Sequence, residues 1–369
     1  MALVNANTPL SKTFSGKKVF VTGNTGFKGS WLSLWLEHLG ANVFGYSNKE
    51  KTQPSMFENL EIEKCVKQFY GDISDRNTLL NTLKIVEPDF IFHLAAQSIV
   101  SASYLNPLET IKTNSLGTAT LLDVLVELEF AGTAVMITSD KCYENDERKS
   151  GYREDDRLGG RDPYSASKAA AEIFLSTYVR SFFRDGAKLR IGIARAGNVI
   201  GGGDWNENRI VVDCVKAWLK GERVSIRNPD ATRPWQHVLE PLSGYLSLAQ
   251  KLYESPDHHG HAFNFGPDES NVYTVSEVVY RLGKCWGFED VTEHVELSRN
   301  KIMHEASLLS LNCEKATKVL SWSPRLEIDE CLTLVADWYI QFGRNPNNLL
   351  DLTIEQIKFY ESKGSLDEK

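Results

Sequence analysis

A glycine repeat between a short apolar run and a helical pattern constrains the fold of this chain more than any other feature. Residues 17–21 (Lys-Lys-Val-Phe-Val) are typical of a short buried strand, and Gly23, Gly26 and Gly29 follow at Gly-x-x-Gly-x-x-Gly spacing. An apolar stripe over residues 31–39 then predicts a helix. Strand, glycine turn and helix in this order predict the first unit of a doubly wound α/β fold, with the helix N-terminus facing a phosphate group.

Each glycine has a separate task in this interpretation. The first permits the tight turn, the second lets a pyrophosphate approach the backbone, and the third lets the helix pack closely on the sheet. A second strand is predicted over residues 42–46, but no acidic residue follows it directly to bind a ribose 2′-hydroxyl. Glu50 comes late, and Lys49 could suit a 2′-phosphate. This segment therefore leaves the choice between NAD and NADP open.

A hydroxyl, a carboxylate and an amine follow a buried strand later in the chain. Further apolar runs predict parallel strands at residues 66–70, 134–137 and 190–194. Residues 90–97 are predicted to form another strand and the turn that follows it. Ser139, Asp140 and Lys141 come just after the run at 134–137. The carboxyl ends of such strands are where open α/β sheets bind ligands. Asp-Lys pairs are also common on surfaces, so this pair needs support from the rest of the chain.

Tyr164 and Lys168 give that support. They are four residues apart in a segment predicted as a helix, so their side chains share one face. An ammonium near a phenol favours the phenolate and is expected to lower the tyrosine pKa from ~10 toward neutrality. A phenolate at working pH can act as a general base. His93, by contrast, lies within an apolar strand and is expected to be an ordinary core histidine.

Composition excludes several classes of protein. The chain has 369 residues, 42% of them hydrophobic, and a net charge of −8 without a basic block, so no nucleic-acid partner is expected. Its six cysteines show no CxxC pair and no Cys/His metal spacing, which predicts reduced thiols and no metal site. No apolar run is long enough for a membrane span, and residues 1–15 are expected to form a loose tail rather than a signal peptide. We therefore expect a cytoplasmic protein without a membrane partner.

Beyond residue 195 the pattern changes from regular strands to glycine-rich and arginine-rich turns. Guanidinium groups and flat rings near turns suit a nucleoside diphosphate, although ordinary surface arginine remains an equal alternative for Arg209 and Arg227. We predict a dinucleotide-binding domain over 16–195, to which 238–268 returns, and a smaller lobe for a nucleotide sugar. The lobe comprises residues 196–237 and 269–350. Later helices are predicted near residues 239–253, 274–286, 313–320 and 328–342.

Taken together, the motifs resemble the extended short-chain dehydrogenase/reductase superfamily, with its Rossmann-type sheet, from Lys17 to about residue 345. The nucleotide-sugar 4,6-dehydratases of that superfamily have Thr-Asp-Glu where this chain has Ser139-Asp140-Lys141. That departure, with Cys142-Tyr143 and the segments 201–205 (Gly-Gly-Gly-Asp-Trp) and 233–241, resembles the CDP-glucose 4,6-dehydratases. The resemblance implies a lyase that uses NAD to convert CDP-glucose to CDP-4-keto-6-deoxyglucose.

The resemblance also implies a role for each catalytic residue. Tyr164, helped by Lys168, would take the proton of the sugar 4-hydroxyl, to which Ser139 would hydrogen-bond. Asp140 would protonate the departing 6-hydroxyl. Lys141 would either remove the carbon-5 proton or remain charged and stabilise the enolate. An ion pair between Asp140 and Lys141 would defeat the acid and base roles, so their side chains are expected to diverge.

Further expectations follow from the same resemblance. The residues expected to bind the cofactor are Gly23, Thr25, Gly26, Phe27, Gly29, Asp72, Ile73, Ala95, Ala96, Gln97, Thr138, Tyr164 and Lys168. The residues expected to bind the substrate are Ser139, Asn198, Arg209, Arg227, Arg233 and His237. A homodimer or dimer of dimers would form through the helices at 107–130 and after Tyr164, with simple core burial as the alternative. The product would supply deoxysugar for lipopolysaccharide O-antigen. A 4-epimerase and a non-catalytic nucleotide-sugar sensor remain alternative functions.

Overall fold

A parallel sheet of seven strands forms the centre of the molecule. The computed structural model describes residues 8–49, 53–148, 150–184, 186–268, 272–297 and 309–364. In the sheet the strands lie in the order β11-β6-β5-β4-β1-β2-β3. Their bounds are β1 Lys18–Thr22, β2 Asn42–Ser47, β3 Lys67–Tyr70, β4 Phe90–His93, β5 Gly132–Ile137, β6 Leu189–Ala196 and β11 Ala262–Phe265. This strand order confirms the predicted doubly wound α/β fold.

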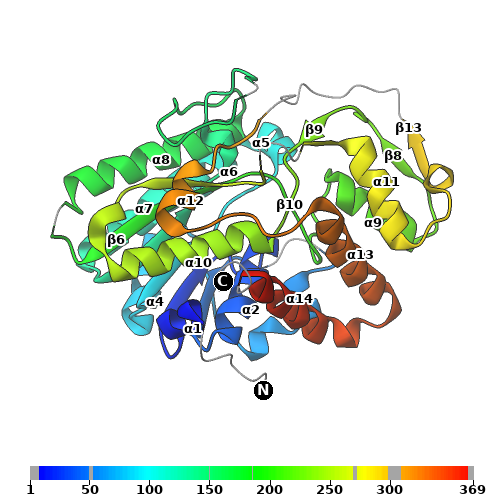
Figure 1. Ribbon diagram of the computed structural model, residues 1–369. Helices are drawn as coiled ribbons and strands as arrows, with labels where there is room; N and C mark the ends of the chain where they lie inside the picture. Colours follow the sequence, from blue (N-terminus) through cyan, green and yellow to red (C-terminus); the bar gives the residue numbers. More distant parts are fainter. Residues whose placement is uncertain are drawn as a thin grey trace.

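Helices cover both faces of the sheet (Figure 1). One face carries α1 (Pro9–Phe14), α2 (Phe27–His38) and α10 (Leu239–Glu254), and the other carries α4 (Arg76–Val86), α7 (Gly117–Glu127) and α8 (Pro163–Ser181). In β1, Val19 and Val21 join the first core and Phe20 joins the second, because side chains alternate along a strand. A strand buried on both faces explains why these segments read as continuous apolar runs.

A smaller lobe lies beyond the carboxyl ends of the central strands (Figure 1). It contains α9 (Ile210–Leu219), α11 (Val275–Trp286) and α13 (Ile328–Arg344). Its short strands pair as β8 (Val224–Ile226) with β13 (Val295–Leu297), and β9 (Thr232–Arg233) with β12 (Tyr273–Thr274). A parallel pair, β7 (Val199–Ile200) with β10 (Gln236–His237), connects the lobe to the sheet. After it the chain returns to the sheet through α10 and β11, which pairs with β6. The domain boundaries themselves stay a prediction.

Short helices complete the connections between these elements. The α-helices among them are α3 (Met56–Asn59), α5 (Val100–Leu105), α6 (Pro107–Ile111), α12 (Glu314–Leu320) and α14 (Leu349–Gly364). The single turns are η1 (Ile62–Lys64), the π-helical η2 (Lys112–Leu116), η3 (Asp140–Cys142), η4 (Pro256–His258), η5 (Val291–His294) and η6 (Pro346–Asn348). No helix within the described part of the chain is long and apolar enough to span a membrane.

Three elements differ from the sequence-based expectations. Residues 9–14 form α1 instead of a loose tail, since the Thr8 side chain caps the helix and Phe14 is fully buried against Phe90, with 4.9 Å between ring centroids. The helix expected over 107–130 is interrupted by the π-helical turn η2 between α6 and α7. The chain also continues beyond the predicted lobe into α14.

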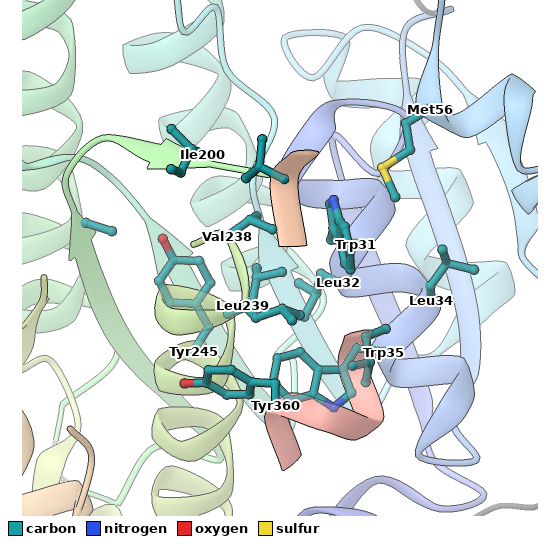
Figure 2. Close-up of a cluster of buried hydrophobic side chains, with 14 of the residues drawn as sticks. Trp31, Leu32, Leu34, Trp35, Met56, Ile200, Val238, Leu239, Tyr245 and Tyr360 are labelled. Atoms are coloured by element: carbon teal, nitrogen blue, oxygen red, sulfur yellow. The ribbon is translucent and has the colours of Figure 1, made fainter. Parts of the chain in front are cut away.

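The helix α14 packs against α2 behind the glycine turn. Figure 2 shows Tyr360 of α14 beside Trp35 of α2, and their rings meet edge to face at 5.6 Å. One turn earlier on α2, Trp31 donates a hydrogen bond from Nε1 to the carbonyl oxygen of Gly202 at 2.9 Å. The helix that begins at the glycine turn is therefore fixed both to the C-terminus and to the glycine-rich segment that enters the lobe.

Candidate active site

The carboxyl ends of the central strands bring the predicted site residues to one edge of the sheet. Gly23 follows β1, Ala95 lies just beyond β4, Ser139 follows β5, and Gly197 follows β6. At Gly23 φ is +71°, and a Cβ atom there would lie 2.7 Å from the backbone nitrogen of Ala95. No residue with a side chain fits this position without moving the backbone. The turns after β1 and β4 thus pack directly on one another at the edge where a ligand would bind.

The glycine turn leaves the N-terminus of α2 open to a ligand. Gly26 is the N-cap residue of α2 and supplies no side-chain hydrogen bond to the first turn. A Cβ atom on Gly29 would lie 2.2 Å from the carbonyl oxygen of Gly23, so the close approach at Gly29 is to the turn itself and not to the sheet as expected. Backbone N–H groups in an uncapped first turn, together with the helix dipole, fit the pyrophosphate of a dinucleotide.

The other predicted cofactor residues lie along the same edge. Thr25 donates a hydrogen bond to Ser47 at the end of β2, with 3.0 Å between their hydroxyl oxygens. Asp72 accepts a hydrogen bond from the backbone nitrogen of Ser74 at 2.9 Å, and Ile73 is buried against Gly117.

Beyond β4, the backbone nitrogen of Gln97 donates to Asn114 Oδ1 at 2.8 Å, and Ala96 lies between Gln97 and Ala95. Phe27 packs beside Gly201 of the lobe. Lys49 is exposed, and Glu50 lies outside the described residues.

Asp140 is held in a buried site at the end of β5. Its side chain is only 4% exposed, and its Oδ1 accepts a hydrogen bond from the Ser139 hydroxyl at 2.9 Å. A Cβ atom on Gly197 would lie 3.1 Å from the other oxygen, Oδ2. Burial raises the pKa of Asp140, while the nearby charges of Lys141 and Lys28 lower it. Among the ion pairs within the described parts of the chain, none joins Asp140 to Lys141.

Tyr164 and Lys168 lie on the first turns of α8, opposite the end of β5. Asp162 caps the helix by accepting a hydrogen bond from the backbone nitrogen of Ser165 at 2.9 Å. The neighbouring Ser139 hydroxyl lowers the pKa of the Tyr164 phenol. Burial raises the pKa of Tyr164 to about 12 and lowers the pKa of Lys168 to about 8. The prediction that Lys168 brings the tyrosine pKa toward neutrality is wrong for this arrangement, because burial raises the pKa of Tyr164 more than the Ser139 hydroxyl and the charge of Arg209 lower it.

A buried ion pair beneath the site was not predicted from the sequence. Arg195 of β6 donates from Nε to Glu172 Oε1 of α8 at 2.8 Å, and both side chains are at most 5% exposed. The Thr138 hydroxyl donates a hydrogen bond to the same carboxylate oxygen at 2.6 Å and so helps to fix the Glu172 side chain. Arg195 also donates from Nη1 to the Tyr143 hydroxyl at 2.8 Å. The sequence did contain one indication of this pair, because Glu172 comes four residues after Lys168 and therefore lies on the same face of the helix.

Lys28 and Tyr245 are two further residues of the site that sequence reasoning missed. Lys28 Nζ donates to the Tyr245 hydroxyl of α10 at 3.5 Å, and Tyr245 is fully buried (Figure 2). Burial and the charge of Arg209 lower the pKa of Lys28 to about 8. A lysine in the first turn of a helix also opposes the helix dipole. Lys28 is therefore a candidate site residue.

The predicted substrate residues divide into an exposed and a buried group. Arg209 donates to Asp204 Oδ2 at 2.7 Å, and Arg227 lies 3.9 Å from Asp213; both guanidinium side chains remain partly exposed. Asn198 follows Gly197 between β6 and β7, and Arg233 lies on β9.

His237 lies in the core beside α2. It is fully buried, and its ring meets Trp31 edge to face at 5.8 Å. Direct contact of His237 with the substrate stays a prediction.

His93 is the core histidine that was expected. Its Nδ1 lies 2.8 Å from the Thr22 hydroxyl and its Nε2 lies 3.1 Å from the Thr118 hydroxyl. Burial lowers the pKa of His93 to about 3, so the ring is neutral.

Comparison with known proteins gives two matches to 4,6-dehydratases of nucleotide sugars. A model of the family described as GDP-mannose 4,6 dehydratase matches residues 20–335. The CDP-glucose 4,6-dehydratase of Salmonella typhimurium is 42% identical over 346 residues, which cover 92% of this chain and 96% of that protein.

Solved structures with the same fold include a dTDP-glucose 4,6-dehydratase and a UDP-glucose 4-epimerase. The dehydratase DesIV of Streptomyces venezuelae, solved with NAD and TYD bound, is 23% identical with a TM-score of 0.76, covering 91% of this chain and 99% of that one. The epimerase of Thermotoga maritima, solved with UDP-glucose, is 21% identical with a TM-score of 0.76, covering 88% of this chain and 99% of that one.

Proposed function

Because the chain belongs to the GDP-mannose 4,6 dehydratase family, we propose that it is a lyase that converts CDP-glucose to CDP-4-keto-6-deoxyglucose with bound NAD. The observation that carries this proposal is the buried Asp140, held by Ser139 next to Tyr164. A carboxyl whose pKa is raised by burial can donate a proton to a departing hydroxyl, a step that a simple 4-epimerisation does not need. The choice of CDP-glucose is supported by the 42% identical relative.

The edge of the sheet fits a nicotinamide dinucleotide. The turn at Gly23 has no room for a side chain, and the first turn of α2 has no side-chain cap. Residues of the glycine turn, including Thr25 and Gly26, would hold the pyrophosphate, and the small residues Ala95 and Ala96 would let the cofactor lie close. Bound NAD would supply a hydride acceptor at carbon 4 of the sugar and a hydride donor at carbon 6.

The remaining steps belong to the side chains of this protein. Tyr164 takes the proton of the 4-hydroxyl, and Ser139 hydrogen-bonds to that oxygen. Lys168 lies one helical turn further along α8, where its charge would favour the phenolate against the burial that raises the pKa of Tyr164 to about 12. Once carbon 4 is a ketone, the proton on carbon 5 is acidified. Asp140 then protonates the 6-hydroxyl, which leaves as water.

The role of Lys141 is the open step of this mechanism. It either removes the carbon-5 proton as a neutral amine or remains charged and stabilises the enolate. Exchange of the carbon-5 hydrogen with deuterated water separates these roles. We expect Lys141→Ala to lose this exchange if Lys141 is the base. A normal exchange rate in that variant would leave the stabilising role alone.

The product itself tests the proposed function. Purified protein with NAD and CDP-glucose should form a 4-keto-6-deoxy sugar, which is detected by its absorbance in alkali. We expect Asp140→Asn to reduce product formation by roughly 10²-fold or more, because the amide cannot donate the elimination proton. Formation of an epimer without this product would indicate the epimerase, and binding without turnover would indicate a sensor. Either result would overturn the dehydratase proposal.

We further propose that the protein acts in the cytoplasm as a homodimer or a dimer of dimers. The candidate surface consists of exposed apolar side chains on α5, α6, η2 and α8 and at the C-cap of α8, and these helices lie side by side. They are Tyr104, Leu105, Leu108, Ile111, Leu116, Ile173, Phe174 and Phe182. The supply of deoxysugar for lipopolysaccharide O-antigen would be the corresponding physiological role.

A further inference from the structure

The glycine-rich segment that enters the lobe carries a buried carboxylate, that of Asp204. Its Oδ1 accepts two hydrogen bonds from Asn206, one from the backbone nitrogen at 3.2 Å and one from Nδ2 at 2.7 Å. Its Oδ2 accepts a hydrogen bond from Arg209 Nη1 at 2.7 Å. Both carboxylate oxygens therefore have partners, and the positive charge of Arg209 compensates the buried negative charge.

The backbone around Asp204 is fixed to two other elements. Its carbonyl oxygen accepts a hydrogen bond from the Tyr339 hydroxyl of α13 at 2.6 Å, and the ring of the next residue, Trp205, meets the Tyr339 ring edge to face at 5.2 Å. On the other side, a Cβ atom on Gly203 would lie 2.7 Å from Met56 Sδ of α3. The segment cannot shift without breaking these contacts. Asp204 is therefore a fixed point for the side chain that it binds.

Arg209 keeps part of its guanidinium group available. It is the N-cap residue of α9, and its side chain is 33% exposed, whereas the side chain of Asp204 is 4% exposed. A guanidinium has five N–H donors in one plane, and Nη1 is the nitrogen that faces Asp204. Burial dominates the pKa of both Lys28 and Tyr164, and the charge of Arg209 lowers each of them. Arg209 is thus close enough to the candidate active site to act on it, and it retains donors for a second anion.

We propose that Asp204 is a positioning residue that holds Arg209 in the orientation in which it binds the diphosphate of the substrate. This inference rests on the proposed function, which assigns Arg209 to a nucleotide sugar. An arginine that moves freely loses rotamer entropy when it binds a phosphate, and one already held by a buried carboxylate loses less. Asp204 acts through the arginine, because its own oxygens already bind Asn206 and Arg209.

Substrate affinity and turnover should respond differently to Asp204→Asn, which removes the charge that holds Arg209 but leaves the guanidinium. The Kd of CDP, measured by titration calorimetry on the holoenzyme, should rise roughly tenfold, the low end of what a hydrogen bond to a charged group contributes. The KM of CDP-glucose should rise with it, whereas kcat and the content of bound NAD should stay at their wild-type values. Asp329→Asn is the matched control, since it removes the carboxylate from an exposed arginine pair at the same distance of 2.7 Å, and it should change none of these values.

Two results for Asp204→Asn would overturn the proposal. A fall in kcat with unchanged CDP affinity would show that the carboxylate does not act on substrate binding. Tighter binding of CDP would show that the carboxylate only weakens the positive charge that the diphosphate meets.

A double-mutant cycle shows whether Asp204 acts through Arg209. Arg209→Gln keeps an N–H donor for the Asp204 carboxylate but removes the positive charge. Adding Asp204→Asn to Arg209→Gln should then change the Kd of CDP by less than about twofold, which is the usual error of additivity. A further tenfold loss of CDP affinity in the double variant would show that Asp204 acts independently of the arginine, and would overturn the proposal.

A second variant covers the case in which thermal unfolding shows that Asp204→Asn does not fold. Asn206→Ala removes one hydrogen bond from Asp204 Oδ1 at a partly exposed side chain, and it should also weaken CDP binding. An unchanged CDP affinity in that variant would count against the positioning role. A wild-type protein that binds CDP but forms no keto product from CDP-glucose would overturn the proposed function and leave the positioning role in place. A wild-type protein that does not bind CDP would overturn both.

Discussion

At Asp140, burial and neighbouring charge act in opposite directions on the same proton. Burial disfavours the carboxylate and raises the pKa of Asp140, whereas Lys141 and Lys28 favour the carboxylate and lower it. As the proposed general acid, Asp140 must be protonated before elimination. Activity that depends on this proton is therefore present below the pKa of Asp140 and is lost as the pH rises through it. The positive charges near Asp140 help to set the pH at which this activity is lost.

Lys28→Met should move the alkaline limb of the kcat–pH profile upward by roughly one pH unit, because it removes a positive charge that lowers the pKa of Asp140. Steady-state kinetics over a range of pH measures the shift. Lys49→Met is the control, since Lys49 is an exposed lysine just beyond β2 and should leave the limb in place. If the limb disappeared instead of moving, it would report the ionisation of Lys28 itself, whose pKa is lowered to about 8.

At the scale of elements, the pair Arg195–Glu172 joins β6 to α8 beneath the catalytic residues. The pair lies one helical turn beyond Lys168, and the charge of Glu172 favours the ammonium form of that lysine. Because α8 carries both Tyr164 and Lys168, its position relative to the strand ends determines whether the phenol reaches Ser139. The ion pair thus positions a helix, and among the candidate site residues it contacts the Thr138 hydroxyl.

Removing one partner of this buried pair should cost more than removing both. Arg195→Met leaves the Glu172 carboxylate buried without its partner, so the free energy of unfolding should fall by about 3–5 kcal/mol. Combining it with Glu172→Leu should recover a large part of that loss. Urea denaturation of the single and double variants measures both values. The exposed pair Arg281–Asp329 is the matched control, and Arg281→Met should cost at most about 1 kcal/mol. Equal costs for the two single variants would contradict the proposed importance of burial.

Elements with a local signal were predictable from the sequence. Apolar runs and the glycine turn indicated the strands β1 to β6, and the spacing of Tyr164 and Lys168 placed both on α8. The helices at 239–253 and 328–342 were also found close to their observed positions. In each case the signal lies within one short window, because backbone geometry and side-chain periodicity are properties of neighbouring residues.

Features that depend on contacts between distant segments were not predictable. The position of His237 depends on the pairing of β10 with β7, in which its partner Ile200 lies 37 residues earlier in the sequence. Nothing in the local sequence shows that pairing. The partners Arg195 and Glu172 likewise belong to different elements, and the burial of Tyr164, which reverses the expected direction of its pKa, is a property of the packed site. The sequence therefore indicated which groups are present but not their environment.

At the scale of the whole molecule, the C-terminal helices hold the lobe against the sheet. Tyr339 of α13 donates a hydrogen bond to the carbonyl oxygen of Gly201 at 3.2 Å, and a Cβ atom on Gly202 would lie 2.0 Å from Trp338. The glycine-rich entry to the lobe is therefore packed under α13, while α14 packs on α2 (Figure 2). Sheet, glycine turn and lobe are joined through these contacts. Around α6 and α8, by contrast, several apolar side chains stay exposed within the described part of the chain.

The uncovered helices lead to a prediction about assembly. Leu108 of α6 and Ile173 of α8 are 80% and 55% exposed, and these helices lie side by side. A continuous apolar surface of this kind is unusual on a monomer and fits a self-complementary interface between two copies. Leu108→Glu combined with Ile173→Glu should shift a wild-type dimer to monomers, because each copy would bury two unpaired carboxylates in the interface. Sedimentation equilibrium measures the mass, and Tyr280→Glu, on the distant α11, should leave it unchanged. A wild-type protein that is monomeric at micromolar concentration, or a double variant that keeps the wild-type mass, would show that these side chains do not form the interface.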